Sequence, residues 1–202
     1  MVPPVGIGSE RSRLRFEEQV LQAFGPVARR FGYRLVKAES TLVRFESERA
    51  FVNVYHGRSS YEIGVEVGPV RSPQDSDRLG YTLDEVVSSM GAPVPEDIKH
   101  CSAVTADRIA VVIPRFVETL EQFGADILAG EAPAFSRLAT YRRLQAEEQL
   151  RASHHEDVRR RAEEAWTRGD FGLVVELYQS IGDALTAVEL KRAEIARSRA
   201  RR

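Results

Sequence analysis

The stretch LVRFESERAFVNVYHGRSSYEIGVEV, residues 42–67, alternates apolar and polar side chains along the chain. This alternation is typical of antiparallel strands that bury one face and expose the other to water. Polar links at residues 48–49 and 57–60 divide the stretch and are short enough for hairpins. With residues 33–39 as a first strand, we predict an antiparallel meander of about four strands, near the usual size of a sheet.

The positions of the two links predict how the strands pair. A turn in the middle of the first link places Phe45 opposite Val52, and one in the middle of the second places Val54 opposite Ile63. Both pairings put the β-branched side chains on one face, as a one-sided core requires. On the outward face, the same register forms a row of three residues: Arg44, Asn53 and Gly64.

Helical spacing of apolar residues surrounds this sheet. Residues 12–31 and 105–128 repeat apolar side chains at helical intervals, and each segment contains a proline. We expect the first helix to kink or restart at Pro26 and the second to kink at Pro114. Thr82-Leu83-Asp84-Glu85 is a capping box that predicts a short helix after it. These helices supply the apolar stripes that the inner face of the sheet needs as a cover.

A long helical tail follows. Apart from Ser153-His154-His155, nothing breaks helix between residues 133 and 168, and apolar residues are sparse in its middle. A helix that is polar nearly all round usually bridges parts of a structure through solvent. Whether residues 145–168 form one helix or two stays open. A second capping box, Thr186-Ala187-Val188-Glu189, opens a final helix that we expect to end near Arg199.

These patterns together predict an α+β fold class. The antiparallel β-meander of about four strands packs with helices and is followed by a long helix and a C-terminal helical hairpin. We divide the chain into a flexible leader at residues 1–11, an α+β domain at 12–130 and a helical tail at 131–202.

The composition excludes several classes of protein. The 202 residues carry a formal net charge of −1, so no global field draws the chain to nucleic acid or membrane. The single cysteine, Cys101, can form no internal disulfide. We expect no signal peptide at the N-terminus, and no apolar run is long enough to span a bilayer. We therefore expect a cytoplasmic protein with no membrane segment, no cofactor and no metal.

Residues 165–178 carry the clearest local pattern in the chain. The pattern consists of a small residue, then a Gly-Asp-aromatic turn, then the apolar start of a helix. Its residues are Ala165, Gly169, Asp170, Phe171, Val174 and Tyr178. This pattern resembles the turn and second helix of a single tetratricopeptide repeat. One such hairpin cannot bury its own apolar face, so the resemblance implies docking on the chain's other helices or on another chain. Its candidate partner-binding residues are Trp166, Phe171 and Tyr178.

The outward face of the meander is a second candidate surface. Phe51 and Tyr55 are large for a face in water, and Gly64 in mid-strand leaves room for a partner to approach. The simpler interpretation is a solvated face with Arg–Glu pairs, or a face covered by one of the protein's own helices. The candidate protein-binding residues of this face are Arg44, Phe51, Tyr55, Glu62 and Glu66.

Two other functions stay open. Glu62 and Glu66 lie on one face of one strand, so a metal-dependent hydrolase could use them, although surface carboxylates are far more often structural. Arginine clusters at residues 159–161 and 197–202 could bind the phosphates of a nucleic acid. The simpler interpretation of the clusters is a solvated cationic helix end, because no aromatic residue that could stack on a base stands beside them in the sequence.

Two further motifs carry no functional signal. In His154-His155-Glu156-Asp157, neighbouring side chains of a helix point in different directions, so His154 and Glu156 do not converge on a metal. In His100-Cys101, nothing nearby orients the imidazole for a nucleophile. The sequence contains no glycine-rich phosphate loop, nucleophile elbow or zinc-ligand spacing.

The sequence therefore favours a non-enzymatic protein-binding module. Its partner would be another protein, or a second copy that associates through the C-terminal helices. The strand region also resembles small bacterial proteins of the immunity or adaptor type. That resemblance implies the same class of function and assigns no functional residue.

Overall fold

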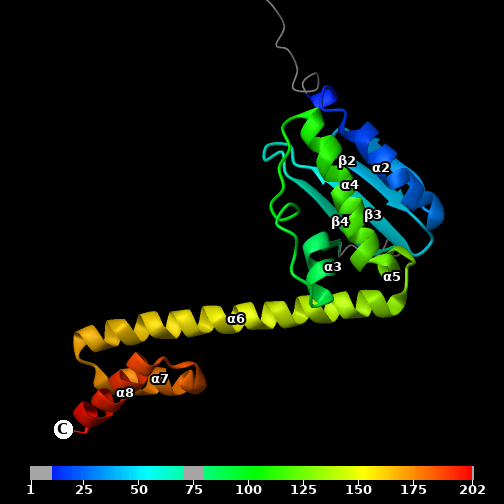
Figure 1. Ribbon diagram of the computed structural model, residues 1–202. Helices are drawn as coiled ribbons and strands as arrows, with labels where there is room; N and C mark the ends of the chain where they lie inside the picture. The colour runs from blue at the N-terminus through cyan, green and yellow to red at the C-terminus, as the bar shows by residue number, and fades with distance from the viewer. Residues whose placement is uncertain (1–10, 71–79, 202) are drawn as a thin grey trace, which may run out of the picture. The chain divides into compact units, whose positions relative to one another are not determined.

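The computed structural model describes residues 11–70 and 80–201 (Figure 1). The chain divides into two compact units, unit 1 (residues 1–142) and unit 2 (residues 143–202). The domain boundary predicted from the sequence lies earlier, at residues 130–131, whereas this division falls inside a helix. Residues 1–10 of the expected leader lie outside the described residues.

Unit 1 contains an antiparallel sheet whose strands follow one another in chain order, β1-β2-β3-β4-β5. The strands are β1 (Arg34–Glu39), β2 (Leu42–Glu46), β3 (Ala50–His56), β4 (Ile63–Pro69) and β5 (Tyr81–Thr82). The α+β fold class and the meander are thus confirmed. The short β5, which pairs with β4 at Val67 and Tyr81, was not predicted from the sequence.

The first hairpin has the predicted register, with Phe45 opposite Val52. The register predicted for the second hairpin is wrong, because Val54 lies opposite Val65 and not opposite Ile63. A shift by two residues leaves every side chain on its own face of the sheet. The composition of the core is therefore as predicted, but the rows of the outward face are different.

A longer loop causes this shift. The backbone N–H of Gly57 donates to the carbonyl of Glu62 at 2.7 Å, and this bond closes residues 57–62 into a loop. Within the loop, Tyr61 has a φ of 53°, in the left-handed region that side chains other than glycine rarely adopt. The local pattern predicts a tight turn at Arg58 and Ser59, because nothing in it distinguishes the two loop lengths.

Helices α2 (Phe16–Arg30) and α4 (Ala106–Phe123) cover the inner face of the sheet (Figure 1). Both continue through their prolines, Pro26 and Pro114. The shorter helices of this unit are α3 (Leu83–Ser89) and α5 (Ala125–Leu128). Thr82 and Glu85 form the predicted capping box at the start of α3.

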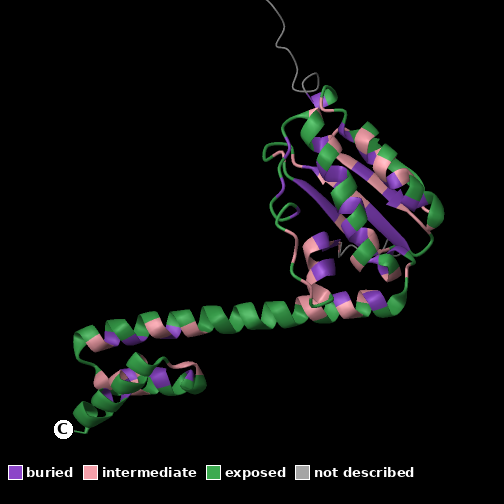
Figure 2. Cartoon of the chain, in the orientation of Figure 1, coloured by how far each residue is buried: buried purple, intermediate pink, exposed green. Residues whose placement is uncertain are grey.

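The core of unit 1 lies between α2, α4 and the sheet, where Figure 2 shows buried residues on the facing sides. The sheet contributes Val43, Phe45, Val52, Val54, Ile63, Val65 and Val67. The two helices contribute Phe16, Val20, Phe24, Ile109, Ile113, Phe116 and Leu120, among others. Each fully buried side chain of this size stabilises the fold by about 1.5–3 kcal/mol before conformational entropy is counted.

Helix α6 (Ala132–Arg168) is one helix, which answers the question that the sequence left open. Its Arg142 donates to the Glu85 carboxylate at 2.6 Å and to the Gly80 carbonyl at 2.7 Å. The Arg142 guanidinium also lies 4.2 Å from the centre of the Tyr81 ring. Burial acts to raise the pKa of Glu85, but hydrogen bonds from Arg142 and Thr82 outweigh it and lower that pKa.

Unit 2 combines the C-terminal part of α6 with α7 (Phe171–Ser180), the 3-10 turn η1 (Gly182–Ala184) and α8 (Ala187–Ala200). Residues 143–154 of α6 are exposed without interruption (Figure 2). Beyond them a second core forms from Val158, Ala162, Ala165, Val174, Leu177, Tyr178, Ile181, Ala193 and Ala196. The apolar face of the α6–α7 hairpin is thus covered by α8 of the same chain.

The turn between α6 and α7 follows from its residues. Gly169 has a φ of 77°, which glycine adopts without strain. The Asp170 carboxylate then accepts a hydrogen bond from the backbone N–H of Leu173 at 3.1 Å and so caps α7. Among the described helices of both units, none has the length and apolar character to cross a bilayer.

Candidate functional site

The outward face of the sheet carries a hydrogen-bonded row that the predicted register had missed. Arg44 lies opposite Asn53, which lies opposite Glu66. Arg44 donates to Asn53 Oδ1 at 3.1 Å, and the Asn53 amide donates to Glu66 Oε2 at 3.5 Å. The Arg44 guanidinium also donates to Glu46 at 2.6 Å and lies 4.2 Å from the centre of the Phe51 ring. The polar groups of this face therefore pair largely with one another.

The space above Gly64 is filled by the protein itself. Tyr55 lies opposite Gly64, and its ring occupies the place where a Cβ on Gly64 would stand. Gly64 stands between Glu62 and Glu66 in the sequence, the two carboxylates considered for a hydrolase. Burial, followed by the charges of Glu62 and Glu66, raises the pKa of the Tyr55 hydroxyl.

Trp166, Phe171 and Tyr178 come together in unit 2. The Trp166 and Phe171 rings meet edge to face with their centroids 5.4 Å apart, and both are half-buried. Tyr178 is buried in the core of the unit, so the chain's own helices already cover it. Arg192 lies 5.5 Å from the Trp166 ring centre, and Arg199 lies 4.9 Å from that of Phe171. The arginines of α8 thus stand beside aromatic rings that are distant in the sequence.

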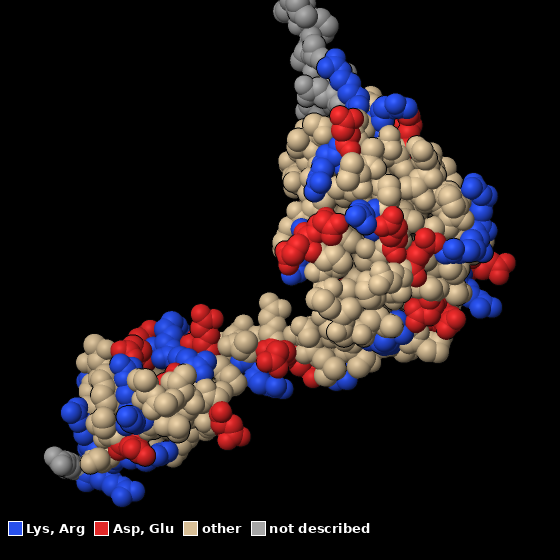
Figure 3. Space-filling view, viewed as in Figure 1, with Lys and Arg blue, Asp and Glu red and all other residues tan. Residues whose placement is uncertain are grey.

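The two arginine clusters differ in how their charges are balanced. Arg159 donates to Glu189 at 2.9 Å, and Arg160 donates to Glu164 at 2.8 Å. Within the described residues, by contrast, no ion pair involves Arg197, Arg199 or Arg201. Basic and acidic side chains nevertheless intermingle over the face of both units seen in Figure 3. No single-sign patch therefore dominates that face.

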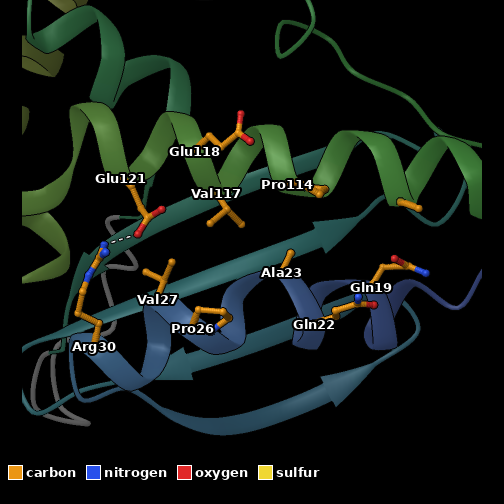
Figure 4. A pocket seen from close by; sticks show the side chains of 11 residues that line it. Gln19, Gln22, Ala23, Pro26, Val27, Arg30, Pro114, Val117, Glu118 and Glu121 are labelled. Atoms are coloured by element: carbon orange, nitrogen blue, oxygen red, sulfur yellow. Dashed lines mark hydrogen bonds and ion pairs between the residues drawn. The ribbon is translucent and has the colours of Figure 1, made fainter.

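A groove of about 510 Å³ lies between α2 and α4, and the sequence analysis did not predict it. It is lined by Gln19, Gln22, Ala23, Pro26, Val27, Arg30, Ala110, Pro114, Val117, Glu118 and Glu121. In Figure 4, the side chains of Ala23, Val27 and Val117 lie between the two helices. An ion pair between Arg30 and Glu121 closes one end (Figure 4). The groove thus has an apolar middle and polar ends, which is the usual composition of a binding site.

Each of the two helices that line this groove contains a proline. Proline has no backbone N–H, so the carbonyl four residues before it loses its usual helical partner. By this rule, Pro26 removes the usual donor of the Gln22 carbonyl, and Pro114 removes that of the Ala110 carbonyl. Both residues line the groove. The only sequence signal for the groove is a proline in each of two predicted amphipathic helices. That signal does not indicate whether the two helices lie side by side.

The remaining candidates show no assembled site. In the stretches 11–70 and 80–201, no group of three or more His, Cys, Asp or Glu side chains is placed to hold a metal ion. The rings of His154 and His155 have centroids 6.1 Å apart and are tilted by 52° on an exposed part of α6. Cys101 is buried, and burial raises the pKa of its thiol, which disfavours the reactive thiolate.

Comparison with known protein families, curated proteins and solved structures finds no match to the chain.

Proposed function

We propose that this protein is a non-enzymatic binding module, of the adaptor or immunity-like kind, that takes a helix of a partner protein into the α2–α4 groove. The observation that carries the proposal is the apolar floor of the groove, where Ala23, Val27 and Val117 lie between polar ends. The prolines of the two helices also remove the usual helical donors of the Gln22 and Ala110 carbonyls. A helix laid between two helices is a recurring mode of recognition.

The other candidate surfaces support this choice. On the sheet, Tyr55 fills the space at Gly64, and the Arg44 row is hydrogen-bonded within itself. In unit 2, α8 covers the hairpin. Within the described residues, the α2–α4 groove is instead lined by α2 and α4, with Gln19 and Gln22 near one end to bind polar groups of a partner.

A helical-peptide library displayed against the full-length protein tests this function. Ala110→Trp fills the groove, whereas Val111→Trp places the same side chain on the next residue, which is exposed and does not line the groove. Peptides enriched on the wild type should bind Ala110→Trp at least about tenfold more weakly, a loss of one hot-spot contact or more. They should bind Val111→Trp unchanged. Equal binding to both variants, or no enrichment of helical peptides, contradicts the proposal.

One observation favours nucleic-acid binding as a second candidate function. In the sequence, no aromatic residue stands beside the C-terminal arginines, but in the fold Trp166 lies beside Arg192 and Phe171 lies beside Arg199. An arginine beside an aromatic ring is a usual element of single-strand binding. Single-stranded RNA and DNA should then quench the fluorescence of Trp166, the only tryptophan, in a salt-sensitive manner. No quenching at low salt rules this candidate out.

A further inference from the structure

Strand β1 is an edge strand that is exposed along its whole length. All of its residues are exposed, among them Leu35 at 48% and Val36 at 47%. It pairs with β2 on one side, and within the described part of the chain no strand pairs with the other side. Such an edge presents a row of unpaired backbone N–H and C=O groups that a further strand can complete.

A bulge in β1 determines which residues share a face. Between Leu35 and Lys37, β1 has one residue more than β2 opposite it. Arg34 and Glu39 both pair with outward-facing residues of β2, so both point to the outward face. They are an odd number of positions apart, and in a regular strand they would point to opposite faces. The bulge therefore brings the first cation and the last anion of the strand to one face.

This arrangement makes β1 complementary to itself. When two copies run antiparallel about a two-fold axis, Arg34 lies opposite Glu39 of the second copy, and the same pair recurs at the other end. Leu35 then lies opposite Ala38 of the second copy on the inner face. Opposite charges that face each other across two strands are stabilising. Lys37, which comes near the axis, is already paired with Glu39 of its own strand at 3.1 Å.

We propose that the protein forms a two-fold homodimer through antiparallel pairing of its β1 strands, which joins two five-stranded sheets into one continuous sheet. The dimer completes the backbone hydrogen bonds of the edge, covers Leu35 and places an Arg34–Glu39 pair at each end of the interface. It uses neither the α2–α4 groove nor the C-terminal helices, so it stands independently of the proposed function.

Charge reversal tests the pairing on the full-length protein by sedimentation velocity. Arg34→Glu and Glu39→Arg each turn two attractive pairs into two repulsive ones, and each should weaken the dimer at least about tenfold. Because one variant is then doubly acidic and the other doubly basic at the interface, an equimolar mixture of the two should associate again. Circular dichroism of each variant checks that the exposed substitutions leave the fold intact.

Three outcomes overturn the proposal: a wild type that stays monomeric at all concentrations, a dimer that both substitutions leave unchanged, or a mixture that does not associate. The second outcome would instead place self-association elsewhere, for example in the C-terminal helices.

Cysteine cross-linking tests the register. Chains with Leu35→Cys should form a disulfide with chains carrying Ala38→Cys, because these positions face each other. Two copies of Leu35→Cys are offset by three residues, or about 10 Å along the strands, which is beyond disulfide reach. The native Cys101 is buried and should stay reduced. If the mixture cross-links no faster than either variant alone, the register is wrong and the proposed dimer is rejected.

Discussion

The aromatic ring of Tyr55 on β3 lies against Gly64, the residue directly opposite it on β4, and leaves no room there for a Cβ. A glycine in mid-strand can mark a place where a partner approaches. In this protein the approaching group is the protein's own phenol ring. This contact fills the open gap at Gly64 that the sequence allowed.

We expect Gly64→Ala to be strongly coupled to Tyr55. In the wild type, the added methyl group should displace the ring and lower the free energy of unfolding by about 1 kcal/mol. In a Tyr55→Ala background, the same substitution should raise it by several tenths of a kcal/mol, because alanine restricts the unfolded chain more than glycine does. Urea denaturation of the four proteins measures this coupling. Simple additivity would show that the ring does not rest on Gly64.

The stability of unit 1 should depend on pH through His56. This residue is 1% exposed, its Nε2 lies 2.9 Å from the Ala103 carbonyl, and its Nδ1 has no partner among the described residues. Burial is the largest cause that lowers the pKa of His56 below 6.5, and the nearby charge of Arg11 adds to it. The folded state therefore holds the ring neutral while the unfolded state takes up a proton.

Because only the unfolded state takes up the proton, the contribution of His56 to the free energy of unfolding is fully present above the unfolded pKa of about 6.5. Below that pH the free energy of unfolding should fall, with a slope of at most about 1.4 kcal/mol per pH unit. His56→Gln should remove that part of the slope in denaturation experiments between pH 7 and 5, values chosen to bracket a histidine titration at about 6.5. His154→Gln, on the exposed part of α6, serves as the control and should leave it unchanged. A slope that survives His56→Gln would assign the pH dependence to another group.

Neighbouring arginines of α6 should differ in their effect on stability. Arg142 binds Glu85, the Gly80 carbonyl and the Tyr81 ring, whereas Arg143 pairs only with Glu147 on the exposed helix surface. Arg142→Ala should cost about 1–3 kcal/mol, since it leaves a partly buried carboxylate without its partner. Arg143→Ala should cost less than about 0.5 kcal/mol. Equal losses in thermal or urea unfolding would mean that the Glu85 contact is not a structural one.

The second core should be sensitive to volume at its alanines. Ala196 is buried in the packing of unit 2, while Ala200 on the same helix is exposed. Ala196→Leu should lower the stability of unit 2 by about 1–3 kcal/mol through overpacking, and Ala200→Leu should have little effect. Trp166 lies in this unit and is the only tryptophan, so its fluorescence reports the unfolding of unit 2 alone. Similar midpoints for both variants would contradict the packing described for α8.

Several predictions from the sequence succeeded because they depend on residues close together in the chain. The pairing of Phe45 with Val52 follows from a short link, and the capping box at Thr82 follows from a spacing of three residues. The register predicted for the second hairpin is wrong because its loop is longer than a tight turn. Its inward residues were still correct, because a shift by two positions preserves the face of each side chain.

The candidate surfaces were harder to predict for the same reason. Arg44 was expected beside Gly64, yet it shares its row with Glu66, and this change turns a supposed gap into a hydrogen-bonded network. The proximity of Trp166 to Arg199 was missed because it requires α8 to fold back along α6.

By itself, the sequence determined the local features of this protein: alternating strands, helix starts at Thr82 and Thr186, and the Gly169–Asp170 turn. These features depend on backbone preferences and on hydrogen bonds between residues a few positions apart. Only the tertiary structure decided which distant surfaces meet, such as the helices of Pro26 and Pro114 that form one groove, or the ring that covers Gly64. The physical reason is that contacts between distant elements depend on loop lengths and on the packing of whole helices and strands. Many different packings share the same side-chain periodicity, so the periodicity does not select one of them.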